Sequence, residues 1–342
     1  MRVTQEPALR KFWYCVTPLA ELDNGPKAFT LLGEKIALWK DAEGKPRAVK
    51  DRCPHRTAQL SGGWVDEGKL VCPYHGWAFA GTGECVRVPQ QPINGPRPFG
   101  VAAYRCEERY GYAWVALEEP LFPIPDIPET RDPGYRQIHE FTEIWACAPL
   151  RIVENSFDGS HISFVHRNTF GNIADPVPAK DELTETADGF ICSNATPVIN
   201  PERMRTALRT EEATTFRYTD NQFMLPFFRV GRIRYPNGLI NILCTAVTPV
   251  TERVTQRIQF VLRNDTEADV PAEKVIAFDR EVSAEDRAVL ETTDEDVPLD
   301  TSEGVELHMG SDMPGLWMRR RLRAILRPGR AAAALDGGAL TA

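Results

Sequence analysis

Short runs of alternating or apolar residues, separated by turn residues, occupy the first third of this 342-residue chain. Each run predicts a short β-strand, because alternation bounded by Gly, Pro, Asn or Asp is typical of strands. Turn residues cluster at 41–44 and 81–83. Many brief strands with such turns predict a small β-sandwich or barrel between about residues 12 and 117. The runs are at 28–32, 35–40, 48–51, 69–72 and 112–116.

The pattern changes after a proline-rich stretch at 120–128. Prolines at this density predict an extended connector between domains. Beyond it, alternating runs predict a large antiparallel sheet with one covered face. Pro271, at an expected first helical turn, opens a long helix to about residue 293. The other elements that we expect are strands at 214–219, 223–230, 238–247 and 255–262, and helices at 150–165 and 314–326.

These elements predict an α+β protein of two domains. We expect a β domain at 1–122, a domain of antiparallel sheet and helices at 123–330, and a disordered tail at 331–342. The apolar stripe of the long helix consists of Val275, Phe278, Val282 and Val289.

Composition narrows the class of protein. The net charge of −8 argues against nucleic acid as a partner. The chain starts without the apolar run of a signal peptide, and no stretch is long and apolar enough to cross a membrane. We therefore expect a cytoplasmic protein without a membrane partner. Six of the eight cysteines show no paired spacing, which favours free, buried thiols.

Cysteine and histidine recur at close spacing in the first domain. Cys53-Pro-His55-Arg56 is followed, after fifteen residues, by Cys72-Pro-Tyr-His75-Gly-Trp77. Each half supplies one thiolate and one imidazole, the ligand set of a Rieske-type [2Fe–2S] cluster. Imidazoles lower the negative charge of such a cluster and raise its reduction potential. A structural zinc site uses the same donor atoms, but C-x-H…C-x-x-H is not the common zinc-finger spacing.

A second pair of histidines, His161 and His166, lies in the second domain. In a regular helix, residues five apart point about 140° away from each other. Binding one metal therefore requires a π-bulge or a helix end between them. Asp158, one turn earlier, is placed to hold an imidazole tautomer. The alternative is that these are ordinary polar residues of a helix.

Two histidines and a carboxylate form the facial triad of mononuclear iron(II). The long helix offers Asp279, Glu281, Glu285 and Asp286. Both aspartates fall within the apolar stripe, where an unpaired carboxylate is costly. Glu285 lies at the margin of the stripe and Glu281 outside it. Spacing alone does not choose between the two aspartates.

The chain resembles the Rieske non-haem iron oxygenases, specifically the oxygenase component (α subunit) of aromatic-ring hydroxylating systems. Its layout looks most like the monooxygenase branch of vanillate, dicamba and caffeine demethylases. The resemblance implies a Rieske β domain on a helix-grip catalytic domain, assembled as a head-to-tail homotrimer. The matching segments are the two cysteine–histidine motifs, residues 106–111 with Trp114, residues 154–166 and residues 284–291.

The resemblance also implies roles for individual residues. Cys53, His55, Cys72 and His75 would bind the cluster. His161, His166 and Asp286 would bind the iron, and Asp286 occupies the carboxylate position of the family. Asp158 would carry electrons from a cluster histidine of one subunit to an iron histidine of the next, and Asn155 would lie near the iron.

The implied reaction is O2-dependent hydroxylation, or O- or N-demethylation with release of formaldehyde, of an aromatic or similar hydrophobic small molecule. We expect apolar residues to line the pocket, among them Phe157, Phe170 and residues 241–243. The chain carries no flavin or nicotinamide fingerprint. Electrons from NAD(P)H must then arrive through a separate reductase, with or without a ferredoxin. The basic run 319–323 could dock such a partner, or could form a solvated helix face.

Two other functions are compatible with the sequence. A cis-dihydroxylating dioxygenase would use the same metals with a different placement of the substrate. A pure Rieske electron carrier would have an inactive second domain.

Overall fold

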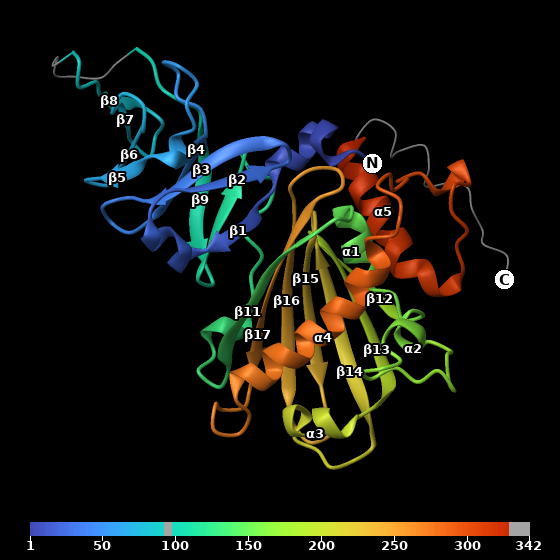
Figure 1. Ribbon diagram of the computed structural model, residues 1–342. Coiled ribbons are helices and arrows are strands. Elements are labelled where there is room, and N and C mark those ends of the chain that lie inside the picture. Colours follow the sequence, from blue (N-terminus) through green and yellow to red (C-terminus); the bar gives the residue numbers. More distant parts are fainter. Residues whose placement is uncertain (92–97, 328–342) are drawn as a thin grey trace. The chain divides into compact units, whose positions relative to one another are not determined.

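The computed structural model describes residues 1–91 and 98–327, so the expected tail at 331–342 lies outside the described residues. The chain has the α+β architecture that the sequence predicts (Figure 1). It divides into two compact units. One contains Val3–Ile124 with Thr248–Thr251, and the other contains Met1–Arg2 and the remaining residues from Pro125 onward.

The N-terminal unit consists of two antiparallel sheets. A six-stranded sheet has the order β1-β10-β9-β4-β3-β2, and a four-stranded sheet has the order β5-β6-β7-β8. All five predicted strands are present, within two residues of their expected ends. The sequence patterns missed β1, β5, β7, β8 and β9. The strands are β1 (Tyr14–Pro18), β2 (Lys27–Leu31), β3 (Glu34–Lys40), β4 (Pro46–Lys50), β5 (Trp64–Asp66), β6 (Lys69–Val71), β7 (Ala78–Phe79), β8 (Cys85–Arg87), β9 (Ala103–Arg109) and β10 (Tyr112–Ala116).

The second unit is built on a seven-stranded sheet with the order β11-β17-β16-β15-β14-β13-β12. The pairs β11–β17, β12–β13, β13–β14, β14–β15 and β15–β16 are antiparallel. Helix α4 (Ala272–Leu290) runs across one face of this sheet (Figure 1). Val275 of α4 packs in a core cluster with Ile138, Ile233 and Val261 of the strands. The strands are β11 (Arg136–Trp145), β12 (Glu182–Thr186), β13 (Gly189–Ile199), β14 (Thr214–Met224), β15 (Phe228–Arg234), β16 (Ile240–Pro249) and β17 (Thr255–Arg263).

The prediction of one continuous helix at 150–165 is wrong. The chain forms α1 (Pro149–Asn155) and the short α2 (Ile162–Val165), with an irregular loop between them. The loop contains Ser156, Asp158, Gly159 and Ser160, all poor helix formers. Asp158 accepts a hydrogen bond from the backbone N–H of Ser160 at 2.7 Å, a local contact that competes with helix formation.

Two further predictions of local structure are wrong. The strand expected at 223–230 is two strands, because residues 225–227 form a turn between β14 and β15. Pro226, which cannot donate a ladder hydrogen bond, marks that turn. On α4, Val289 is 47% exposed, and the buried positions are Val275, Asp279, Ser283 and Leu290.

The C-terminal helix α5 (Met313–Leu326) is close to its predicted bounds. Its basic run is not a uniformly solvated face, because Arg319 is buried and pairs with Glu154 and Glu306. As expected for the six cysteines outside the two motifs, none forms a disulfide within the described residues, and all of them except Cys106 are buried. No helix in residues 1–91 and 98–327 is long and apolar enough to cross a membrane, and the cytoplasmic location remains a prediction. The remaining helix α3 covers Glu202–Leu208.

Candidate cluster site and active-site cavity

Two loops of the N-terminal unit carry the cysteine–histidine motifs, and their backbones close in the same way. The N–H of Thr57 donates to the carbonyl of Cys53 at 3.0 Å, and that of Gly76 donates to Cys72 at 3.1 Å. Each turn therefore brings a histidine back beside its cysteine. Gly76 has a φ of +70°, a conformation that favours glycine.

The four donor side chains divide into two pairs. Cys53 and Cys72 are buried, at 2% and 1% exposure. His55 is exposed and His75 half-buried, with their ring centroids 4.5 Å apart. Burial, together with a smaller contribution from the neighbouring Cys72, raises the pKa of Cys53 to about 11. A thiol of this kind is ionised when a metal replaces its proton. Two inner thiols and two outer imidazoles fit the donor set of a Rieske cluster.

Aromatic packing restricts the outer histidine. The ring of Trp77 stacks on His55 at 4.8 Å and 3° between planes. Phe99 stacks on Trp77 in turn, at 5.0 Å. This packing limits the orientations of an imidazole that is otherwise open to solvent.

In the second unit, the broken helix brings His161 and His166 together. They flank α2, with His161 at its start and His166 at its end. Their Nε2 atoms lie 3.2 Å apart. The helix end required by their spacing is therefore present in the structure.

Asp286 of α4 completes a compact group of three donors. Its Oδ1 lies 3.2 Å from Nε2 of His166 and 3.5 Å from Nε2 of His161. The centre of such a triangle is about 2 Å from each corner, the usual length of a metal–ligand bond. Two imidazoles and one carboxylate on one face are also the donors that mononuclear iron(II) takes. The residues therefore fit an iron ion.

Neighbouring side chains hold two of these donors in place. Glu285 accepts a hydrogen bond from Nδ1 of His166 at 2.9 Å, and Thr169 donates its hydroxyl to the same carboxylate at 2.7 Å. Asn155 donates to Oδ1 of Asp286 at 2.9 Å. Helical spacing places Glu285 at the margin of the apolar stripe of α4, so its contact with His166 was not predicted from the sequence.

The pKa shifts follow from these contacts. Burial lowers the pKa of His166, but the carboxylates of Asp286 and Glu285 outweigh burial and raise it overall. Burial raises the pKa of Asp286, but His166, His161 and Asn155 lower it below its ordinary value. The directions of the two pKa shifts show that Asp286 and His166 stabilise each other's charged form.

Asp158 lies on the outer side of His161. Its Oδ2 is 3.4 Å from Nδ1 of His161, a buried atom without an aligned hydrogen-bond partner in the described residues. Burial raises the pKa of Asp158, but His161 and the backbone of Ser160 lower it overall. About a third of its side chain (33%) is exposed, so it can contact a further group.

Asp279, the alternative that spacing allowed, lies apart from the three donors. It is buried and is paired with Glu140 of β11. Burial and the charge of Asp279 raise the pKa of Glu140 well above its ordinary value. Burial also raises the pKa of Asp279, so it favours the protonated form of both carboxyl groups.

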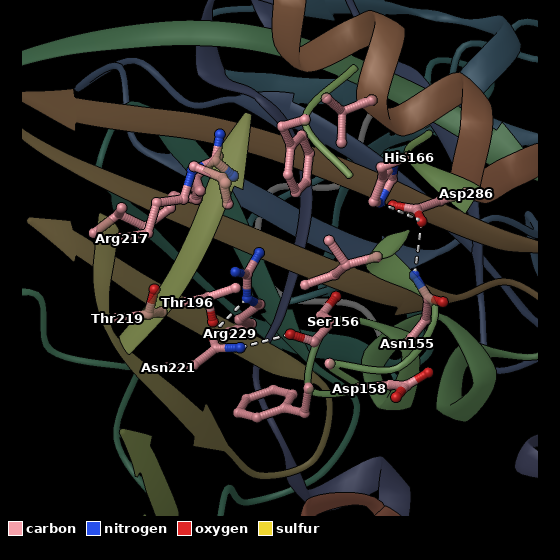
Figure 2. A pocket seen from close by; sticks show the side chains of 18 of the residues that line it. Asn155, Ser156, Asp158, His166, Thr196, Arg217, Thr219, Asn221, Arg229 and Asp286 are labelled. Carbon is pink, nitrogen blue, oxygen red and sulfur yellow. Dashed lines mark hydrogen bonds and ion pairs between the residues drawn. The ribbon is translucent and has the colours of Figure 1, made fainter. Parts of the chain in front are cut away.

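A cavity of about 190 Å³ adjoins the three donors, between α4 and the sheet. Phe157, Phe170, Asn241 and Leu243 line it, as the sequence suggested. The expectation of an apolar lining is wrong in one respect. The cavity also contacts Arg217, Arg229 and Asn221 (Figure 2). Arg257 and Asn194 belong to the same lining. Alternation along the strands places these polar residues on the inner face of the sheet.

Comparison with protein families divides the chain in the same order. A Rieske [2Fe-2S] domain matches residues 12–104. A vanillate O-demethylase oxygenase C-terminal domain matches residues 145–327, more than half of the chain.

Individual proteins of known activity are similar in sequence or structure to this chain, some over nearly all of it and others over about half. The methylxanthine N1-demethylase NdmA of Pseudomonas putida is 29% identical, over 93% of this chain and 89% of that protein. A solved structure of NdmA with caffeine from P. putida CBB5 matches with a TM-score of 0.79 at 25% identity, over 94% of this chain and 96% of the other. The oxygenase component of dicamba O-demethylase from Stenotrophomonas maltophilia is 35% identical, over 46% of this chain and 48% of that protein.

Proposed function

Because this chain belongs to the Rieske non-haem iron oxygenases and is an oxygenase component of that family, we propose that it removes a methyl group from oxygen or nitrogen of an aromatic small molecule. One atom of O2 enters a C–H bond of the methyl group. The product then releases formaldehyde and leaves a hydroxyl or N–H group on the ring. The other oxygen atom leaves as water, with electrons and protons supplied from outside.

The first part of the proposal assigns the cluster. Cys53, His55, Cys72 and His75 hold a Rieske [2Fe–2S] cluster, supported by the two inner thiols and two outer imidazoles described above. The cluster supplies electrons singly at the raised potential that histidine ligation gives. Trp77 keeps the imidazole of His55 oriented by stacking.

The second part assigns the mononuclear iron. His161, His166 and Asp286 would hold iron(II), and the chemistry that the bound ion would supply is activation of O2. Glu285 holds the proton on Nδ1 of His166, so that Nε2 is directed at the metal. Asn155 keeps Asp286 oriented through its amide. The cavity beside these residues holds the substrate and limits the entry of water.

The third part concerns partners. Electrons from NAD(P)H reach the cluster through a separate reductase, with or without a ferredoxin. The protein acts as a homotrimer, in which Asp158 links His161 to His75 of the next subunit. The partial exposure of Asp158 beside His161 supports this assignment.

The convergence of His161, His166 and Asp286 beside a cavity, in a chain that also has a Rieske domain, carries the proposal. The test is turnover of the purified protein with a reductase, NADH and a panel of methoxy- and N-methyl arenes. We expect formaldehyde together with an equal amount of the demethylated arene. A cis-dihydrodiol product would instead show a dioxygenase, and no product from any compound would contradict the proposal.

A further inference from the structure

Two of the three arginines at the cavity form no direct ion pair with a carboxylate of the described residues. Arg257 lies near four carboxyl groups (those of Glu140, Glu143, Asp279 and Asp286) and donates to Ser283 at 2.7 Å. Arg229 also experiences the charges of Asp286 and Asp279, and Arg217 that of Asp279, but neither forms an ion pair within residues 1–91 and 98–327. Both arginines are half-buried, and a partly desolvated cation without a direct partner is costly, so an external anion would stabilise these two positions.

Arg229 is held through its Nε, and its two Nη groups donate no hydrogen bond to the part of the chain that the structure describes. Its Nε donates to Oδ1 of Asn221 at 2.6 Å, and Asn221 in turn donates to the carbonyl of Ser156 at 2.6 Å. Gly231, two residues along the strand, makes room for the guanidinium, because a Cβ there would lie 2.6 Å from Nη2 of Arg229. Burial lowers the pKa of Arg229 to about 10, which still leaves it charged at neutral pH.

Arg217 lies on the neighbouring strand β14. Its guanidinium rests over the ring of Phe170 at 4.1 Å, and its buried Nε has no hydrogen-bond partner in the described residues. Asn241, only 7% exposed, also lines the cavity, and its Oδ1 accepts no hydrogen bond from residues 1–91 or 98–327. Unpaired donors and acceptors thus meet around one cavity, where a polar ligand would satisfy them.

The size of the cavity limits the ligand. A cavity of about 150 Å³ accommodates one benzene molecule, and this one measures about 190 Å³. It therefore fits a single ring with small substituents. Figure 2 shows Arg217 and Arg229 across the cavity from His166 and Asp286. A ring held by the arginines would extend toward the candidate iron ligands.

We propose that Arg217 and Arg229 bind the carboxylate of a single-ring aromatic substrate and make the enzyme selective for aromatic acids over neutral arenes. The planar guanidinium matches a carboxylate with two parallel hydrogen bonds, which favours this anion. This inference rests on the proposed function, because it names the substrate class of the same cavity.

The test is binding of 2-, 3- and 4-methoxybenzoate and of the corresponding neutral methoxybenzamides to the full-length protein, by titration calorimetry without O2. At least one methoxybenzoate should bind about tenfold or more tightly than its amide, as expected for hydrogen bonds to a charged group. Equal binding of acid and amide for all three pairs, or no binding of any acid, overturns the inference. This comparison needs no variant.

Substitutions of Arg217 and Arg229 test whether these two residues cause the preference for the acid over the amide. Arg217→Gln and Arg229→Gln should each weaken binding of the acid by about 10- to 100-fold and change binding of the amide by less than about threefold. Arg229→Lys, which keeps the charge, should recover part of the loss. Arg234→Gln is the matched control, since Arg234 lies on the same strand β15, is exposed and pairs with Asp220. Equal losses for acid and amide, or no loss in either variant, overturn the assignment.

Formaldehyde release, measured separately, distinguishes this inference from the proposed function. Arginine-dependent binding of an acid without formaldehyde contradicts demethylation and leaves the anion site supported. Formaldehyde from neutral arenes, without preference for an acid, supports demethylation and overturns the anion site.

Discussion

Glu285 and His166 form a hydrogen bond of 2.9 Å between Oε2 and Nδ1, and this contact determines which ring nitrogen faces the candidate metal position. The next residue, Asp286, lies 3.2 Å from the other nitrogen of the same ring. Two adjacent carboxylates of α4 therefore act on opposite sides of one imidazole. A carboxylate that holds the outer nitrogen fixes the tautomer and raises the basicity of a metal ligand.

Substitution Glu285→Gln should weaken iron binding by about 10- to 100-fold, because glutamine keeps the shape but loses the charge that stabilises His166. The measurement is titration of the iron-free protein with iron(II). Glu281→Gln is the control, since Glu281 lies on the same helix and is exposed. An unchanged affinity in Glu285→Gln would show that His166 does not depend on this contact.

Asp286→Asn should remove the mononuclear iron and leave the cluster in place. The wild-type protein should contain about three irons per chain, two in the cluster and one at the triad. The variant should contain about two, with an unchanged visible spectrum of the cluster. Asp279→Asn should retain all three, because Asp279 pairs with Glu140 and not with the histidines. Iron loss in Asp279→Asn alone would contradict the assignment.

Asp158→Asn should lower the rate of formaldehyde release by about 10- to 100-fold while iron content and substrate affinity stay the same. The physical reason is loss of the negative charge 3.4 Å from Nδ1 of His161. Asp175→Asn, an exposed aspartate beyond α2, serves as the control. Turnover near the wild-type rate in Asp158→Asn would mean that electrons take another route between the centres.

The variant Glu140→Gln should be more stable than the wild-type protein, and its advantage should grow as the pH rises. Burial, and then the charge of Asp279, raise the pKa of Glu140 in the folded state. The folded protein therefore keeps a proton that the unfolded chain releases above about pH 4.3. Stability from this group is present below that pH and is lost as the pH rises toward the raised pKa. Glutamine does not titrate and can still bind Gln259 and Asp279.

The measurement is the thermal midpoint of wild type and Glu140→Gln at about pH 5 and about pH 8. The advantage of the variant should be roughly 2–4 °C larger at the higher pH. Glu43→Gln, at an exposed position, should show no such trend. An advantage that shrinks with rising pH would mean that Glu140 is ionised in the folded protein.

The sequence predicts the N-terminal β domain and the α+β class because these depend on local patterns. Strand alternation repeats every two residues, and the two cysteine–histidine motifs are each contained in one loop. Long elements with a strong period, such as the helix observed at Ala272–Leu290, are also predictable from sequence. The break between α1 and α2 was missed because the apolar spacing of 150–165 favours helix, whereas Asp158 and Gly159 favour a loop.

The candidate site was only partly predictable, because it depends on contacts distant in sequence. Asp279 and Asp286 lie on one face of the same helix, and only packing against Glu140 and His166 separates them. The cavity arginines depend on strand register, which pairs Phe223 of β14 with Arg229 of β15. One signal was present, since Arg217, Thr219 and Asn221 recur at every second position of a strand. Because alternate residues of a strand share one face, this spacing indicates that one face of the sheet is polar. An apolar pocket would not have such a face.

A single turnover tests the central claim most directly, which is that the cluster and the triad act together to demethylate an aromatic substrate. The protein is reduced chemically, the reductant is removed, and a methylated arene that binds the protein is added with O2. We predict that the cluster is reoxidised as formaldehyde forms, and that Asp286→Asn abolishes the formaldehyde. Reoxidation of the cluster without any formaldehyde, or an equal yield from Asp286→Asn, would contradict the account.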